Sequence, residues 1–215
     1  MVSSSISSEE LKTSMVSYVI YPMFISLSHE TRRKTMDSRT ETAAQLHLRA
    51  LVDADREAFL EAVAAWPASE SMTFAPGFDT SPSFPEYVTL LNAQAQGEKL
   101  PEGWVPSVTV FAFVGSEIVG RVQLRMHLND FLRRVGGQIG YVVLPAFRRR
   151  GYAKAMLGQA LRLARTLGLR RVLLTCDDDN PASIHTIEGA GGTLEDTVVV
   201  GDDMPKKRRY WIELG

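Results

Sequence analysis

Two adjacent segments in the middle of the chain have strand patterns, the first almost entirely hydrophobic and the second with hydrophobic and polar residues in alternation. The first is the run VTVFAFV at 108–114, and the second begins at Ile118 after the turn-forming tripeptide GSE. Because successive side chains of a strand point to opposite faces, residues 108–114 and 118–128 are predicted to form a β-hairpin. In the second strand one face would carry Val122, Leu124, Met126 and Leu128. The other face would carry Arg121, Gln123, Arg125 and His127.

Helical periodicity is strongest over residues 152–168, which end at a glycine suited to terminate a helix. The predicted buried stripe consists of Ala153, Met156, Leu157, Ala160, Leu163, Ala164 and Leu167. A second helix is expected to start after Asn180, an N-cap residue followed by Pro181, and to run to about Ala190.

Two further helices are predicted in the first half of the chain. One presents a hydrophobic face over residues 58–66, with Asp53 as its N-cap and Pro67 at its end. The other lies at 84–96 within the segment 68–107, which is rich in serine, proline and glycine. Segments of this composition suit a flexible region that covers a substrate.

Two strands are hydrophobic on both faces, namely residues 136–145 and 170–177. Strands of this kind are typically covered on both sides, so we expect the first at the centre of a sheet and the second buried as well. A short strand at 46–50 precedes the others, and residues 193–200 and 208–214 are predicted to form a final hairpin. The alternation of strands and helices predicts a mixed α/β domain with one central sheet.

The N-terminal residues have a different composition. Residues 1–42 are mostly polar and rich in serine, and their hydrophobic stretch at 15–28 is interrupted by Pro22. That stretch is too short to span a membrane and lacks a clean cleavage site, which disfavours a signal peptide. We expect a disordered or loosely docked extension before a domain at 43–215, with Met36 as an alternative start.

The overall charge limits the kinds of partner. The chain has 24 Lys and Arg against 25 Asp and Glu, a net charge of −1, which disfavours a general nucleic-acid binder. Its single cysteine, Cys176, rules out an internal disulfide and suits a reducing compartment. We therefore expect a cytoplasmic protein with no membrane and no nucleic-acid partner.

The stretch LPAFRRRGYAKAML at 144–157 carries the clearest chemistry. A strand, a short turn and a glycine lead here into a helix N-terminus, whose free amides and dipole favour an anion. Gly151 would allow a phosphate to approach the backbone, and the small Ala153 would keep that approach open. Neither the nucleotide P-loop nor the dinucleotide-binding glycine pattern is present. The alternative is an ordinary solvated helix start with three arginines at 148–150.

The same stretch resembles the signature [RQ]-x-x-G-x-[GA] of the GNAT superfamily of N-acetyltransferases. Arg148, Gly151 and Ala153 fill its three fixed positions. The block RVLLTCDDDNPASIHTIEGAGG at 171–192 resembles the strand and helix that follow in this superfamily, and the likeness extends over about 46–214. The combination looks most like a bacterial branch of predicted acetyltransferases. It implies an α+β fold with a mixed, mostly antiparallel twisted sheet of six to seven strands and helices on both faces.

The resemblance also implies a binding site for acetyl-CoA. The pyrophosphate would lie on backbone amides beside Arg148, and these belong to Arg149, Arg150, Gly151, Tyr152, Ala153 and Lys154. The pantetheine arm would pair like an added strand with Tyr141, Val142 and Val143, where two central strands splay apart. Asn180 would contact the pantetheine, although a pure N-cap role explains this residue equally well. No metal is implied.

For catalysis the resemblance implies direct attack of an amine on the acetyl carbon, with a base and an acid. Many members place the acid, a tyrosine, seven residues after the asparagine, and here that residue is Ile187. Ser183 is a candidate to hydrogen-bond the sulfur, or else a cap residue. Where some members have a catalytic glutamate this chain has Gln138, an amide that cannot act as a base.

The base therefore has three alternatives: His127, Asp130 or a chain of water molecules to bulk solvent. Both residues are also typical of a solvated strand face and turn. Cys176 is interpreted as a buried strand residue, because acetyl transfer in this superfamily is direct.

Two functions remain open. The first is an N-acetyltransferase that acts on an amine of a small molecule or peptide. The second, suggested by the missing tyrosine and glutamate, is a non-catalytic acyl-CoA-binding or sensor domain of the same fold. The acidic run at 177–179 either attracts a cationic amine or complements the following helix dipole. A homodimer is compatible with the sequence but is not specified by it.

Overall fold

The computed structural model describes residues 45–70, 72–79, 83–201 and 204–215. The expected extension at 1–42 and the alternative start at Met36 lie outside these ranges, so both stay predictions. No helix within the described ranges is long and apolar enough to cross a membrane.

The described residues form seven strands in two antiparallel sheets. The first sheet has the order β1-β2-β3-β4, with bounds β1 (His47–Arg49), β2 (Ser107–Val114), β3 (Glu117–Arg125) and β4 (Ile139–Val143). The second has the order β5-β7-β6, with bounds β5 (Arg171–Asp177), β6 (Thr193–Val198) and β7 (Lys207–Glu213). The predicted mostly antiparallel architecture is confirmed, but the strands divide between two sheets instead of forming the one central sheet expected. The two sheets meet where their edge strands β4 and β5 face one another.

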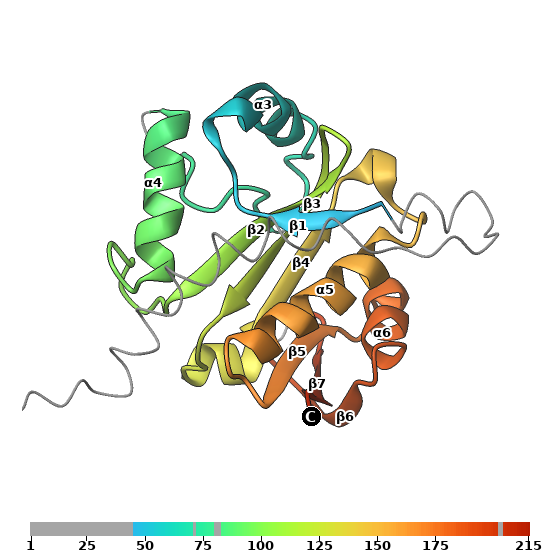
Figure 1. The fold of residues 1–215 in the computed structure, drawn as a ribbon. Coiled ribbons are helices and arrows are strands. Elements are labelled where there is room, and N and C mark those ends of the chain that lie inside the picture. Colours follow the sequence, from blue (N-terminus) through green and yellow to red (C-terminus); the bar gives the residue numbers. More distant parts are fainter. Residues whose placement is uncertain (1–44, 71, 80–82, 202–203) are drawn as a thin grey trace, which may run out of the picture.

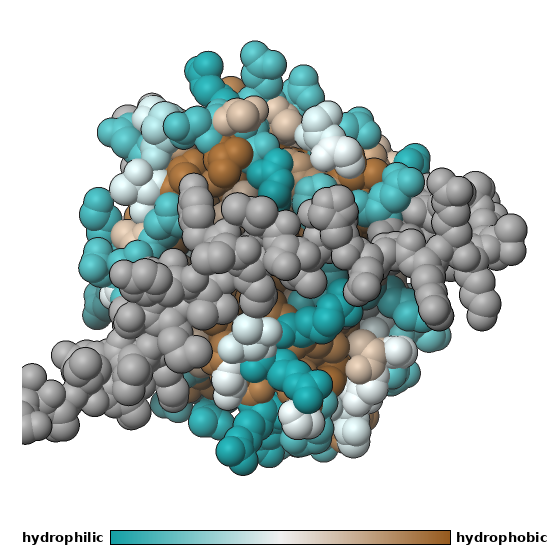
Figure 2. Space-filling model, in the orientation of Figure 1, coloured by the Kyte–Doolittle hydropathy of each residue, from teal (hydrophilic) through white to brown (hydrophobic). Residues whose placement is uncertain are grey.

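Helices cover both faces of these sheets, as predicted. Their bounds are α3 (Arg56–Ala64), α4 (Phe84–Ala95), α5 (Tyr152–Thr166) and α6 (Pro181–Glu188). In Figure 1, α3 lies at the top and α4 at the left of the view, α5 crosses the lower centre, and α6 lies at the lower right. The predicted stripe of α5 packs into one hydrophobic cluster, and residues of α3 and α4 form a second cluster around Phe59. The outer rim of the same view is mostly hydrophilic (Figure 2).

The polar face of β3 is covered, which the alternating pattern did not predict. Arg121 is only 2% exposed and Gln123 only 6% exposed, because the aromatic cluster of α3, α4 and β2 packs over this side of the sheet. Burial lowers the pKa of Arg121 to about 10, which leaves the guanidinium charged at neutral pH. β3 also ends at Arg125, three residues before the predicted end at Leu128.

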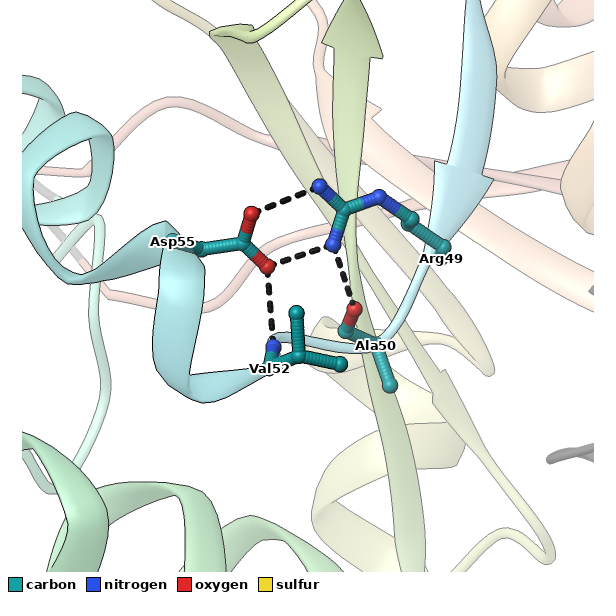
Figure 3. A network of polar contacts seen from close by, with 4 residues as sticks. All are labelled: Arg49, Ala50, Val52 and Asp55. Carbon is teal, nitrogen blue, oxygen red and sulfur yellow. Dashed lines mark hydrogen bonds and ion pairs between the residues drawn. The ribbon is translucent and has the colours of Figure 1, made fainter.

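The start of α3 differs from the prediction as well. Asp53 begins a 3₁₀ turn, is exposed and makes no hydrogen bond through its side chain within the described residues, whereas Asp55 is the residue that precedes α3. Figure 3 shows the Asp55 carboxylate between two guanidinium nitrogens of Arg49, at 2.5 and 2.6 Å, and the amide of Val52 at 2.8 Å. This carboxylate therefore joins β1 to the helix that follows it.

We expect the Asp55→Asn variant to lose about 2 kcal/mol of unfolding free energy at pH 7, because it removes charged hydrogen bonds from a buried group. Burial raises the pKa of Asp55, but the bonds from Arg49 and Val52 outweigh it, and the net pKa is lowered. A lowered pKa stabilises the fold above the unfolded value of about 3.9, and this contribution is lost as the pH falls through the folded value.

Urea denaturation of wild type and variant at pH 7 and at pH 3 measures this effect. The difference between the two proteins should shrink at pH 3, and a difference that does not change with pH would contradict the assignment. The exposed Asp53→Asn variant is the matched control and should change stability by less than about 0.5 kcal/mol.

Candidate active site

β4 and β5 separate from a single point of contact. The amide of Gln138 donates to the carbonyl of Leu173 at 2.7 Å, and the amide of Leu173 donates to the Gln138 side chain at 3.0 Å. Beyond this point β4 pairs only with β3, and β5 pairs only with β7. Gly137, at φ 64, permits this approach, since a side chain there would meet the Leu173 carbonyl at 2.8 Å.

A cleft of about 520 Å³ opens between the separated strands. It is lined by Trp66, Glu70, Met72, Tyr141, Val142, Val143, Phe147, Arg148, Arg149, Gly151, Tyr152, Ala153, Lys154, Asp177, Asn180, Ala182, Ser183 and Thr186. The residues predicted for the cofactor site thus lie together, with the exception of Arg150. The opening is continuous from β4 to the N-terminus of α5 and the first turns of α6.

The register of β4 decides which backbone groups face the cleft. Gln138 and Leu144 bond across to β3, since Gln138 accepts from the Arg125 amide at 2.8 Å and Leu144 donates to the Val119 carbonyl at 3.0 Å. Bonding residues alternate in an antiparallel pair, so Val142 also bonds to β3, and Tyr141 and Val143 direct their backbone groups away from it. Of the three residues predicted to pair with pantetheine, Tyr141 and Val143 therefore face the cleft edge of the strand, where the Val143 carbonyl accepts from Arg148 at 3.1 Å.

The turn before α5 leaves a series of amides without helical partners. The first bond of the helix runs from the Ala155 amide to the Gly151 carbonyl at 3.1 Å, so the amides of Tyr152, Ala153 and Lys154 precede it. Gly151 is the N-cap at φ 81, and Arg149 has a left-handed φ of 62, which costs a non-glycine residue about 1 kcal/mol. Strain of this kind concentrates at functional sites, and the free amides here point to an anion.

The three arginines of the turn differ in their roles. Arg148 donates to the Val143 carbonyl at 3.1 Å and to Glu70 at 2.6 Å, so its charge is already paired. Arg150 lies over the ring of Phe147, 5.5 Å from its centroid, and does not line the cleft. Only Arg149 both lines the cleft and makes no ion pair within the described residues. Arg148 therefore fixes the turn to the segment after α3, and Arg149 is the arginine available to an anion.

The start of α6 has the predicted cap. The Asn180 side chain accepts from the Ser183 amide at 3.0 Å, which confirms the N-cap and leaves the amide NH₂ without a hydrogen bond in the described chain. Asn180 and Ser183 both line the cleft. Ile187, which lies where the sequence resemblance led us to look for a tyrosine, is 1% exposed and packs in the core.

The two predicted bases lie apart from the cleft. His127 and Asp130 are exposed in the segment that follows β3, and neither lines the opening. Cys176 is buried, as predicted, and burial raises the pKa of its thiol to about 11, which keeps it protonated. No cluster of three or more metal-ligating side chains of His, Cys, Asp or Glu occurs among the described residues.

Several cleft residues were missed by the sequence interpretation. Trp66, Glu70 and Met72 come from the end of α3 and the segment after it, and Thr186 comes from α6. The composition of residues 68–107 suggested a covering segment but did not indicate which of its residues reach the site. Only the folded chain brings Glu70 to the cleft, because it is held there by Arg148, which lies 78 positions later in the sequence.

Comparison with known proteins identifies the family. Residues 77–191, more than half of the chain, match the model of the Acetyltransferase (GNAT) family. No curated protein matches.

Solved structures share the fold at low sequence identity. A spermidine N-acetyltransferase chimera from Vibrio cholerae and hSSAT is 20% identical, with a TM-score of 0.54 over 79% of this chain and 96% of that one. An acetyltransferase from Salmonella typhimurium that modifies the N-terminal serine of ribosomal protein L7/L12 is 19% identical, with a TM-score of 0.55 over 79% and 95%. A GNAT acetyltransferase from Streptococcus pneumoniae is 20% identical, with a TM-score of 0.55 over 79% and 99%. The chain therefore belongs to the GNAT family of acetyltransferases, which use acetyl-CoA as the acetyl donor.

Proposed function

We propose that this protein transfers an acetyl group from acetyl-CoA directly to an amine of a small molecule or a peptide, with the donor bound in the cleft between β4 and β5. The observation that carries the proposal is the continuity of two features in one opening. The cleft edge of β4, with the backbone of Tyr141 and the amide of Val143, leads directly to the free amides at the start of α5. An elongated ligand with a polar amide arm and a pyrophosphate fits that combination.

The free amides of the turn and of α5 would bind the pyrophosphate, with Arg149 as the nearby cation. The pantetheine amides would pair with the backbone of Tyr141 and Val143, and the unbonded NH₂ of Asn180 would donate to this arm. A backbone N–H of the same strand edge would then stabilise the oxyanion that forms when the amine attacks the thioester. Direct transfer gains much of its rate from holding the two reactants together.

The acceptor is proposed to be an amine because GNAT relatives of this fold include enzymes for spermidine and for a protein N-terminal serine. Those substrates belong to the relatives, and the present cleft is bordered by Trp66, Met72 and Glu70, of which Glu70 is already paired. His127 and Asp130 stay predictions for the base. A water chain is the third route for the proton of the attacking ammonium.

Release of free CoA in the presence of an amine panel tests this function. The panel contains polyamines, amino acids and short peptides with free N-termini. We expect protein-dependent CoA release with at least one of them, and acetylation of that amine by mass spectrometry. Binding of acetyl-CoA without turnover across the whole panel would favour the alternative, a non-catalytic acyl-CoA-binding or sensor domain.

A further inference from the structure

The negative charges on the walls of the β4–β5 cleft are already balanced. Among the described residues only two carboxylates line it, those of Glu70 and Asp177. Glu70 pairs with Arg148 at 2.6 Å. Asp177 pairs with Lys207, and it is the only member of the acidic run at 177–179 that lines the cleft. A second ammonium group on an acceptor would therefore find no unpaired carboxylate on these walls.

The unpaired charges of the cleft are positive. Arg149 and Lys154 line it, and neither makes an ion pair within the described residues. Both belong to the turn and the first residues of α5, where the free amides would hold the pyrophosphate. The negative charge of the pyrophosphate would balance these two cations. The donor thus uses the free charges of the cleft, and none is left for a charged end of the acceptor.

The side chains of β4 give the cleft two sides. Tyr141 and Val143 pack against the hydrophobic cluster that contains α5, whereas Val142 belongs to the cluster formed with α3 and α4. In the proposed function the donor takes the side of α5 and α6, because the free amides lie there. The acceptor is then left with the α3 side, where Trp66 and Met72 line the cleft.

Hydrophobic side chains form the wall on the α3 side. The Trp66 indole nitrogen donates to the Met72 carbonyl at 2.7 Å, which holds these two residues next to each other. The Trp66 ring also packs against Phe74, with 5.6 Å between the ring centroids. Met72 is 43% exposed, and the half-buried Phe147 borders both sides of the cleft. A hydrophobic group that covers this wall would gain free energy by removing its surface from water.

We propose that the acceptor is a primary monoamine whose other end is uncharged and hydrophobic, an alkylamine or an arylalkylamine. This inference rests on the proposed function and names its substrate class. The hydrophobic end packs on Trp66 and Met72, and the nitrogen attacks the acetyl carbon of the donor. As the amide bond forms, the C–S bond breaks and its electron pair goes to sulfur. The ammonium loses two protons, of which one ends on the CoA thiol and the other passes to water.

Hexylamine and hexamethylenediamine test the effect of a second charge alone, since their carbon chains have the same length. We expect the wild-type kcat/KM for hexylamine to be about tenfold higher, because the second ammonium of the diamine loses water without gaining a carboxylate. Release of free CoA measures both rates. A diamine that reacts equally well or better overturns this inference and leaves the proposed function standing, as does transfer only to other amines. Absence of transfer to any amine overturns the proposed function and this inference with it.

The Met72→Glu variant places a carboxylate on the hydrophobic wall. We expect its kcat/KM for hexamethylenediamine to rise about tenfold relative to that for hexylamine, because the second ammonium gains a counter-charge. Leu60→Glu is the matched control, since Leu60 is also an exposed hydrophobic residue, at 38%, but lies on α3 outside the cleft. This control should keep the wild-type ratio. An unchanged ratio in Met72→Glu would show that the acceptor does not contact this wall, and would overturn the inference.

Discussion

The Gly151→Trp variant is expected to bind acetyl-CoA at least about 100-fold more weakly than the wild type. Gly151 has φ 81 and ψ 0 at the N-cap of α5, next to the free amides that would hold the pyrophosphate. A bulky side chain there covers these amides, and a non-glycine residue in this conformation adds about 1 kcal/mol of strain. Calorimetric titration with acetyl-CoA measures the affinity, and circular dichroism checks that the variant is folded.

Two controls separate the anion site from general effects. Gly158 lies in the same helix, where an added Cβ would meet only the Arg162 side chain at 3.9 Å, so Gly158→Ala should keep the affinity and raise stability by about 0.5 kcal/mol. Arg150→Ala should weaken binding less than Arg149→Ala, since only Arg149 lines the cleft. Wild-type affinity in Gly151→Trp would place the pyrophosphate elsewhere.

The Gly120→Ala variant is expected to lose about 3 kcal/mol of unfolding free energy. An added Cβ at this position in β3 would lie 2.4 Å from the Val142 carbonyl oxygen and 2.9 Å from the Met156 side chain. Met156 is flexible, but the carbonyl belongs to β4 and cannot move without disturbing the β3–β4 ladder. Overpacking of a buried site costs about 1–3 kcal/mol, and the backbone contact places this variant at the upper end.

Urea denaturation with an unchanged m-value measures this loss. Because the displaced strand forms one wall of the cleft, the variant should also bind acetyl-CoA more weakly at temperatures where it is still folded. A Gly120→Ala protein as stable as the wild type would show that β3 and β4 are farther apart than described here.

The sequence predicted those elements that depend only on residues close together in the chain. The stripe of α5, the cap at Asn180 and the turn at Gly151 each depend on residues within one or two helical turns, and the structure confirms the helix and the cap. The hairpin of β2 and β3 follows in the same way from alternation. The helix start was misplaced at Asp53 because the cap-like carboxylate that matters, Asp55, is selected by Arg49 in the preceding strand.

Burial and the cleft walls depend on distant segments. The pattern of β3 gave the correct faces, but Arg121 is buried because α3 and α4, more than 25 positions earlier in the chain, pack over it. Val142 bonds to β3 whereas its neighbours in β4 face the cleft, and this difference depends on how β3 and β4 pair, which the sequence of β4 alone does not show. The proximity of Tyr141 to Ser183 likewise depends on β4 and α6 lying side by side in the fold.

A second hollow in the structure is a competing site for acetyl-CoA. A space of about 700 Å³ lies between α3 and the turn from β2 to β3, and its lining includes Glu57, Glu61 and Glu117. It is larger than the β4–β5 cleft, but its carboxylates would repel a pyrophosphate. The β4–β5 cleft is therefore the better site for a pyrophosphate, although it is the smaller of the two spaces.

Hydrogen exchange of backbone amides with and without acetyl-CoA distinguishes the two sites most directly. We expect slower exchange at Tyr141 and Val143 and at residues 149–154 when acetyl-CoA binds, with no change at Glu57, Glu61 or Glu117. Protection confined to α3 and the β2–β3 turn, with unchanged exchange along β4 and at the start of α5, would contradict the assignment of the donor site.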